Sequence, residues 1–394
     1  MTPSGVKERP ENNSDIEGRV QLGLTMRKGE SIQAHITLLH GTIFGSDPTR
    51  ATGGLVVPNS YNTVDTQNSI IVNQAYGWWR ATESMSLKAG RFHVEVGGGE
   101  FFSADSWKLV PITHEGFQVS FDTGFAGVSA FLLKDKELVP QAGMDSDPEQ
   151  HNFILSADFK DMPEAIQTAN LTFLNISRSE NANPAANAQH VGLTLGGEIA
   201  GIFYKAVYGH QMGVVAKTAA GETKLDANMY DLTLGVRVPE IMGLRVWGNY
   251  HSDSGDDNGA DDTENGYQSL YYDSHKYGGM MDLFGWGNLT YWNVGAAVAP
   301  SDDFEVGLSF FSFSKTKENG GSVGTNLGRT FLGASTNKAN LGMELDLYMT
   351  QKFESGFRLD AHLATFMPGE AFKDAVPKRE AAIMQLMVAG TMTF

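Results

Sequence analysis

Titratable residues are the first place to look for chemistry in this sequence. Its ten histidines are scattered, and no His-Glu-x-x-His zinc motif occurs. The absence of cysteine excludes a disulfide scaffold and cysteine-based zinc sites. We therefore predict no catalytic residue, no enzyme activity and no cofactor.

A compact charged group lies near the end of the chain. Glu344, Asp346, Arg358 and His362 fall on two neighbouring candidate strands. One interpretation is a charged ring at a constriction. The other, which we favour, is a wall network in which inward charges pair with one another. Acid–base hydrolysis is a distant third, because no nucleophile with a recognisable neighbour accompanies the group.

An acidic segment stands out at residues 253–264, which carry six acids and no base. Oxygen-rich loops can bind Ca²⁺, but this spacing does not follow the EF-hand order. We expect a solvated acidic loop, with loose divalent-cation bridging to lipopolysaccharide as an intermediate interpretation. The weak candidate metal ligands are Asp253, Asp256, Asp257, Asp261 and Asp262.

The segment 97–114 is the best candidate for a loop that narrows a channel. It begins with three glycines, which allow sharp backbone turns. Its constriction candidates are Phe101, Phe102, Trp107 and Lys108, and the three aromatic groups need a place to bury. Two placements are open: the loop folds into a barrel mouth, or it caps the outer rim.

The overall charge excludes one class of partner. Lys and Arg number 29 against 46 Asp and Glu, which gives a formal charge of −17, whereas nucleic-acid binding needs a basic surface. No apolar run approaches the roughly 18 residues of a membrane helix. The mean hydropathy of −0.23 is a value typical of soluble proteins. Strict alternation, however, hides a membrane band by averaging apolar outer faces with polar inner ones.

The C-terminus shows this alternation clearly. Met384, Leu386, Val388, Met392 and Phe394 share one face of a strand that ends the chain on an aromatic residue. A bacterial outer-membrane barrel closes with such a strand. Segments of about ten alternating residues recur from end to end, which is typical of transmembrane barrels.

Seventeen candidate strands follow, separated alternately by short and long connections. Short connections are typical of periplasmic turns and long ones of outer loops. The first strand then runs inward from outside, so an even-numbered barrel needs one more strand, for which residues 2–10 are the only candidate. The seventeen segments are roughly 18–28, 31–43, 69–82, 85–96, 115–123, 125–135, 151–161, 166–178, 188–198, 200–211, 228–238, 242–252, 287–299, 303–316, 339–352, 356–367 and 382–394.

We therefore predict that residues 1–394 form one all-β domain, a transmembrane antiparallel β-barrel in the bacterial outer membrane. It has about 18 strands, or 16 if two weak segments do not pair, with short periplasmic turns and long outer loops. No signal peptide is present in this sequence, so we expect that one has been removed.

Alternation also assigns side chains to the two faces of the wall. Aromatic residues near strand ends are predicted to form interfacial girdles: Trp78, Trp79, Trp247, Trp286, Tyr291, Trp292, Tyr348 and Phe394.

The inward positions hold equal numbers of bases and acids. The predicted pore-lining residues are Arg19, Arg27, Arg80, Arg91, Glu95, Asp122, Arg237, Arg245, Glu344, Asp346, Arg358, Asp360 and His362.

Several stretches resemble the alginate-export family of outer-membrane barrels. Leu87-Lys-Ala-Gly-Arg91 looks like that family's Leu-x-x-Gly-Arg strand, and Asn340-Leu-Gly-Met-Glu-Leu-Asp-Leu-Tyr-Met with Phe366-Met-Pro-Gly-Glu-Ala-Phe372 looks like its Gly-x-Glu-x-Asp strand and Phe-x-Pro-Gly loop. The stretch from Asp273 to Leu289 is similar to a loop that enters a later strand. The resemblance implies a pore of about 18 strands, with export of an acidic polysaccharide as one known role. Thr113-His-Glu-Gly-Phe117 departs from the family's Arg-x-Phe-Asp-Gly segment.

Three functions compete for such a barrel. A charge-balanced wall does not supply the positive field that draws a polyuronate through a pore. We therefore predict a porin-type channel for small polar solutes. The alternatives are an exporter of an acidic polysaccharide and a structural, self-associating protein with a loop-closed pore. The expected partners are outer-membrane lipid and lipopolysaccharide, with a homo-oligomer formed at small lipid-facing residues such as Gly295 and Ala296.

Overall fold

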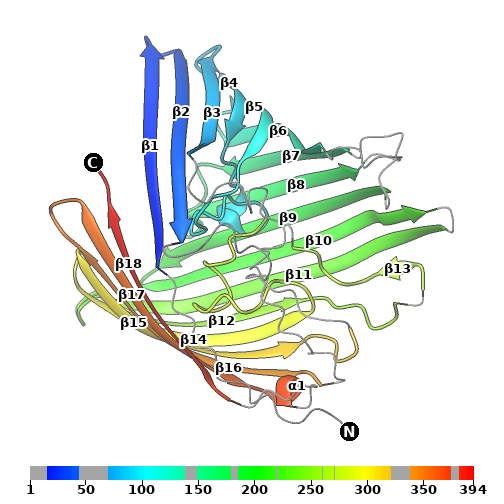
Figure 1. Cartoon of the computed structure of the whole chain (residues 1–394), viewed down its shortest axis with the longest axis vertical. Helices are drawn as coiled ribbons and strands as arrows, with labels where there is room; N and C mark the ends of the chain where they lie inside the picture. The colour runs from blue at the N-terminus through cyan, green and yellow to red at the C-terminus, as the bar shows by residue number, and fades with distance from the viewer. Residues whose placement is uncertain are drawn as a thin grey trace, which may run out of the picture.

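One curved antiparallel sheet makes up the protein (Figure 1). The computed structural model describes residues 16–43, 70–137, 149–178, 185–218, 221–259, 261–269, 271–320, 338–373 and 381–394. Two short helices occur in these ranges, η2 (Gly97–Gly99) and α1 (Glu370–Lys373), and no helix found there is long and apolar enough to span a membrane.

The predicted all-β fold and the strand number are confirmed, because the sheet has eighteen strands. Seventeen are long and coincide with the seventeen candidate segments. The eighteenth, β13, has only two residues, and residues 2–10 lie outside the described ranges. The strands are β1 (Glu17–Lys28), β2 (Ile32–Ile43), β3 (Ile71–Arg80), β4 (Met85–Phe92), β5 (His114–Asp122), β6 (Ala126–Glu137), β7 (Glu149–Phe159), β8 (Thr168–Arg178), β9 (Ala185–Ile199), β10 (Ile202–Thr218), β11 (Gly221–Val238), β12 (Leu244–Asp253), β13 (Thr263–Glu264), β14 (Leu289–Ser301), β15 (Phe304–Lys315), β16 (Asn340–Lys352), β17 (Phe357–Pro368) and β18 (Ile383–Met392).

The strands follow a simple meander. Each long strand pairs antiparallel with its long neighbours in the chain, and β13 adds parallel to β11. Connections at one end are short, as at Asp122–Ala126, where the Asp122 carboxylate accepts a hydrogen bond from Gly124 N at 3.0 Å and the glycine takes a φ of 87°. Among the described residues β1 and β18 do not pair with each other, and they point in the same direction.

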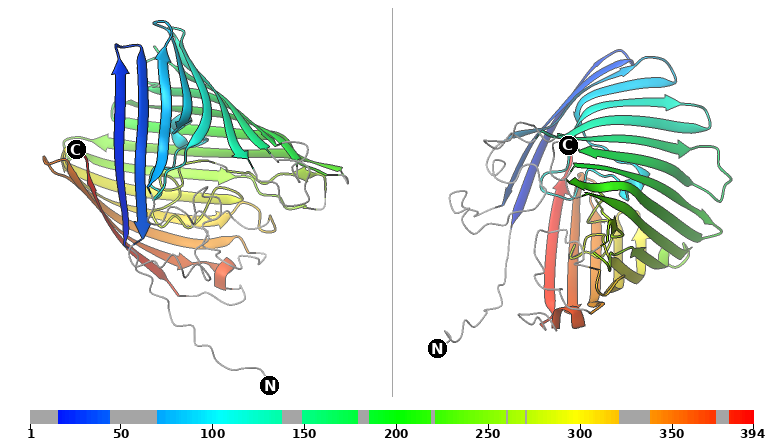
Figure 2. Two further views of the ribbon diagram at one scale, coloured as in Figure 1. Left: turned by 45° about the horizontal axis from the view of Figure 1, so that its top comes forward. Right: turned by 90° about the vertical axis from the view of Figure 1, so that its right-hand side faces the viewer.

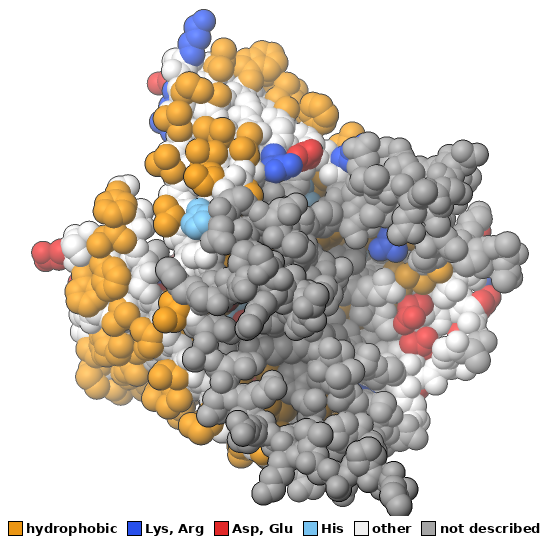
Figure 3. Space-filling view, viewed as in Figure 1, with side chains coloured by type: hydrophobic (Ala, Val, Ile, Leu, Met, Phe, Trp, Pro, Cys, Tyr) orange, Lys and Arg blue, Asp and Glu red, His pale blue; other side chains and the backbone are white. Residues whose placement is uncertain are grey.

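The outward face of the wall is apolar. Phe117, Leu132 and Phe153 face one another across β5, β6 and β7, and all three are exposed. Figure 3 shows hydrophobic side chains gathered over the strands near both ends of the chain. A long apolar outer face on a sheet with polar inner positions is the pattern expected of strands that meet lipid.

Two connections fold into the space enclosed by the sheet (Figure 2). We call residues 93–113, between β4 and β5, the first inner loop, and residues 265–269 and 271–288, between β13 and β14, the second inner loop. The first packs on inward-facing apolar residues of β4 to β8, such as Leu133 and Ile154. The second packs on those of β10 to β17, such as Phe313 and Phe366. Both apolar groups lie toward the end of the barrel with the long connections.

The aromatic girdle prediction is only partly correct. Trp79 and Trp292 point outward and are about half exposed, and Phe394 is exposed at the chain end. The remaining aromatic residues of that set face inward or lie in an inner loop. Trp247, for example, donates to Asn293 Oδ1 at 2.9 Å, and its ring fills the space above Gly295, which therefore faces inward and not toward lipid.

Candidate functional site: a lumen crossed by two inner loops

Phe101 anchors the first inner loop to the wall. Gly192 on β9 and Gly209 on β10 are register partners, and their missing side chains leave a notch that holds the Phe101 ring. The neighbouring Phe102 packs on His114, with ring centroids 4.7 Å apart. Both rings are buried inside the sheet. Of the two placements left open by the sequence, the structure therefore has the loop inside the mouth.

Charged groups hold the same loop from both sides. The buried Glu100 carboxylate pairs with Lys205 on β10 and accepts a hydrogen bond from Tyr277 Oη at 2.8 Å. On the opposite side, Arg19 on β1 donates from Nη1 to the carbonyl oxygens of Ser106 and Lys108, at 2.9 and 2.8 Å. The loop is therefore fixed to strands that lie on different sides of the lumen.

His251 and Asp253 anchor the second inner loop. The Asp253 carboxylate accepts hydrogen bonds from Gly287 N at 2.9 Å and Leu289 N at 2.6 Å. His251 lies between two carboxylates, with Nε2 3.1 Å from Asp253 Oδ2 and Nδ1 3.3 Å from Asp231 Oδ2. Its ring stacks on Trp286 with centroids 4.5 Å apart. The histidine and both carboxylates are buried, so the loop is locked onto β12.

The two loops meet inside the barrel, beside β17. Trp107 stacks on His275 with centroids 3.9 Å apart, and both rings lie nearly parallel to the ring of His362 on β17, at 6.1 and 6.0 Å. Ser274 Oγ donates to Asp105 Oδ2 at 2.8 Å. Trp107 itself keeps 41% of its surface exposed. This three-ring stack joins both inner loops to β17.

Strand register places most of the predicted pore-lining set on the inward face, with two corrections. Arg91 pairs with Glu115 and follows Ala89 on the same side of β4, so it shares the outward face with Phe117. Glu95 lies beyond the end of β4, in the first inner loop, and does not line the wall. The residues on inward positions are Arg19, Arg27, Arg80, Asp122, Arg237, Arg245, Glu344, Asp346, Arg358, Asp360 and His362.

Both corrections concern the same strand. The predicted segment 85–96 runs past Phe92, the buried residue at which β4 ends and the chain turns into the lumen. The prediction assigned inward and outward faces to the whole segment, and that assignment rested partly on residues that belong to the loop. One base and one acid leave the inward set, so these two corrections do not alter the balance of charge predicted for the wall.

Inward charges near the short-turn end form ion pairs with one another. Arg245 lies 2.6 Å from Glu305, Arg237 lies 3.4 Å from Glu198, and Lys160 lies 2.7 Å from Asp122. Arg358 pairs with Asp360 at 2.8 Å. Exposed pairs of this kind contribute little to stability, and within each pair the opposite charges largely cancel.

The charged group at the end of the chain divides into two parts. Glu344 and Asp346 are fully buried and accept backbone hydrogen bonds from Met281 N at 3.0 Å and Met280 N at 3.3 Å. Arg358 pairs with Asp360 instead of with these two acids. The two acids therefore hold the second inner loop, while His362 belongs to the three-ring stack.

Sequence reasoning missed Lys88 and Lys205, which face inward. Lys88 Nζ lies 5.2 Å from the ring centre of Tyr76 and 5.1 Å from that of Phe92. The phase error on β4 is the reason that Lys88 was missed. The cross-strand pairing of Ala89 with exposed Phe117 gives the correct phase, but a single sequence does not reveal register.

The acidic segment is held by its own turns. Asp253 is buried at the end of β12, Asp257 pairs with Lys317 at 3.0 Å, and Asp261 accepts a hydrogen bond from Asn258 Nδ2. No group of three or more histidine or acidic residues in the described part of the chain has the geometry to hold a metal ion.

Burial changes the protonation of groups in the inner loops. Desolvation, together with the nearby charges of His114 and Arg19, lowers the pKa of His93 to about 4. Desolvation raises the pKa of Asp282, although His275 at 2.8 Å opposes the shift. The neutral His93 ring lies with Nε2 3.0 Å from Asn73 Oδ1, and this contact fixes the start of the first inner loop to β3.

The protein should lose stability as the pH falls through the range set by His93. The unfolded chain binds a proton near pH 6.5, but the folded chain does so only near pH 4, so folding is fully favoured above pH 6.5 and weakens below it. After allowance for partial exposure, we expect the free energy of unfolding to fall by about 2 kcal/mol as the pH drops from 6.5 to 4. Melting in detergent between pH 4 and 8 measures it. His93→Asn should flatten this dependence, and an equally steep profile in the variant would contradict the assignment.

The comparisons with known proteins agree with this architecture. The sequence matches the family model described as alginate export over residues 8–384. No curated protein matches it. The structure is similar to that of Pseudomonas aeruginosa OccK9 (OpdG), with a TM-score of 0.62, 11% identity and coverage of 95% of this chain and 90% of that chain.

Two further structures are similar. Pseudomonas aeruginosa OccK2 (OpdF) gives a TM-score of 0.60 at 12% identity, covering 96% of this chain and 91% of that chain. The same protein in complex with glucuronate gives 0.57 at 12% identity, covering 89% and 85%. At these identities the likeness establishes a shared fold.

Proposed function

Since this chain belongs to the alginate export family, we propose that it is a porin-type outer-membrane channel for passive passage of small polar solutes. The observation that carries the proposal is the stack of Trp107, His275 and His362, which joins both inner loops to the wall inside the barrel. A sheet of this strand number encloses an aqueous space, and the inner loops reduce it to a narrow passage. Solutes then pass according to size and charge.

The distribution of inward charge favours solutes that carry a carboxylate. Arg27, Arg80 and Lys88 face the lumen from β1, β3 and β4, beside the polar side chains of Gln118 and Ser120. OccK2, whose fold this chain shares, has been solved with glucuronate, a sugar acid. Both observations support passage of small organic anions.

Export of an acidic polysaccharide is the second candidate, and the family name supports it. Two observations weigh against it. A long polyanion needs a continuous basic path, whereas the bases Arg237, Arg245 and Arg358 are each paired with an acid. The two inner loops also join across the lumen through ring stacking and hydrogen bonds, so a polymer would have to displace them.

Planar-bilayer conductance of the purified protein tests the proposal. We expect small, weakly selective steps from the wild type, and steps about twofold larger from Trp107→Ala, because the narrowest part of a pore sets its conductance. Trp79→Ala, which removes an exposed outward indole, is the matched control and should conduct like the wild type. Strong anion selectivity with block by polyuronate would favour the exporter. Absence of conductance in every variant would overturn the channel.

A further inference from the structure

A row of charged side chains crosses the lipid-facing wall of β4 to β7. Arg91, Glu115, Lys134 and His151 are consecutive cross-strand partners. Arg91 Nε donates to Glu115 Oε1 at 2.8 Å, and the Glu115 and Lys134 side chains are exposed. The energetic cost of a charge on a lipid-facing surface is high at the bilayer midplane and falls to nearly nothing at the interface. The row must therefore lie at the edge of the apolar band.

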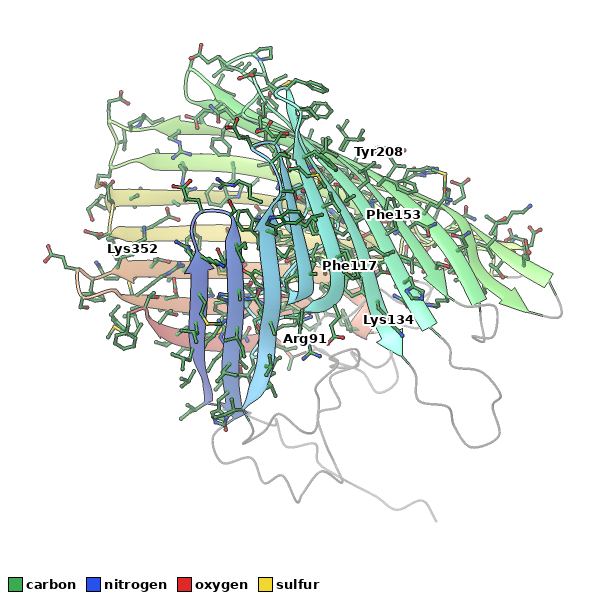
Figure 4. All side chains as sticks on the ribbon, turned by 90° about the horizontal axis from the view of Figure 1, so that it is seen from above. Arg91, Phe117, Lys134, Phe153, Tyr208 and Lys352 are labelled. Atoms are coloured by element: carbon green, nitrogen blue, oxygen red, sulfur yellow. The ribbon has the colours of Figure 1, made fainter. Side chains whose placement is uncertain are left out.

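Its height in the membrane follows from the connections. Arg91 precedes the first inner loop by two residues, and Lys134 lies near the end of β6, so both are at the end of the wall that carries the long connections. Figure 4 shows the labelled Arg91 and Lys134 toward that end, with Phe117 and Phe153 nearer the middle. The row thus lies at the outer leaflet.

The pattern around the row matches the chemistry of one kind of lipid. Directly beneath the charges, two residues deeper along each strand, the wall presents Phe117, Leu132 and Phe153 to the bilayer. Basic groups above an apolar surface fit a phosphorylated headgroup above acyl chains. Arginine and lysine side chains both bind phosphate.

We propose that this row is a binding site for the phosphorylated lipid anchor of lipopolysaccharide, with Arg91 and Lys134 on the phosphate and Phe117 and Phe153 against the acyl chains. Glu115 lies between the two bases and opposes the phosphate. Substitutions of the bases and of the acid should therefore change the affinity for the lipid in opposite directions. Removal of either base weakens binding, whereas removal of the Glu115 charge strengthens it.

The experiment measures binding of Kdo2-lipid A to the full-length protein in detergent, with enzymatically dephosphorylated lipid A and inorganic phosphate as comparison ligands. Each base near a membrane surface contributes about fivefold to affinity, so the Arg91→Gln/Lys134→Gln variant should bind about 25-fold more weakly. Glu115→Gln should bind more tightly than the wild type. Dephosphorylated lipid A and inorganic phosphate should bind weakly to all three proteins.

A matched control removes the same net charge at the other end of the wall. Lys28→Gln/Lys352→Gln alters two bases beside short turns, and its affinity for Kdo2-lipid A should equal that of the wild type. Equal loss in both double variants, or tight binding of dephosphorylated lipid A, would overturn the site. A weaker Glu115→Gln would do the same, since it would indicate a structural ion pair in place of a ligand site.

Discussion

Gly192→Val should open the channel. A β-carbon built at Gly192 overlaps three ring carbons of Phe101, whose side chain is 4% exposed and anchors the first inner loop. Overpacking of a filled site costs about 1–3 kcal/mol, and the loop can relieve it by leaving the notch between Gly192 and Gly209. We expect larger conductance steps in planar bilayers, together with faster tryptic cleavage at Lys108.

Gly77→Val is the matched control for this substitution. A β-carbon at Gly77 meets nothing within 4 Å, and the residue lies on the outward face of β3. The control adds the same side chain to another strand, so its conductance and its cleavage should match those of the wild type. If Gly192→Val also matched the wild type in both measurements, Phe101 would not be the anchor of the loop.

His251→Phe should have the largest effect on stability. The replacement keeps an aromatic ring against Trp286 but leaves the Asp231 and Asp253 carboxylates buried beside each other without the imidazole. Loss of one partner from a buried charged group costs about 3–5 kcal/mol. We expect a lower melting temperature in detergent and release of the second inner loop, seen as larger conductance steps.

A rescue variant distinguishes charge from packing in this prediction. His251→Phe/Asp231→Asn/Asp253→Asn removes the uncompensated carboxylates and keeps an amide oxygen for the backbone donors of Gly287 and Leu289. It should recover most of the lost stability. Failure to recover would show that the loss arises from the shape of the phenyl ring and not from the buried charge.

The fold could be predicted from the sequence to a large extent. Alternation of period two runs through each long strand, so segments such as 339–352 and 356–367 coincide with β16 and β17 almost to the residue. The error on β4 has a local cause. Its outward face reads Leu87, Ala89 and Arg91, and the inward face reads Ser86, Lys88 and Gly90, so neither face is clearly apolar.

The candidate site could be predicted only in part. Phe101, Phe102 and Trp107 were found because large aromatic groups in a glycine-rich loop need burial. The second inner loop was missed as a constriction element, since its partners on β12 and β16 are far away in the sequence. The role of Glu344 and Asp346 as acceptors for Met281 and Met280 depends on that packing, which no short-range pattern encodes.

The inner loops also have a consequence for assembly. Where they pack, the strands are apolar on both faces: in β6 and β7 the outward Leu132 and Phe153 alternate with the inward Leu133 and Ile154. Before the barrel forms, such segments are uncharged, β-prone and fully exposed, which is the signature of aggregation-prone sequence. We therefore expect the unassembled chain to aggregate readily until its own loops cover these strands.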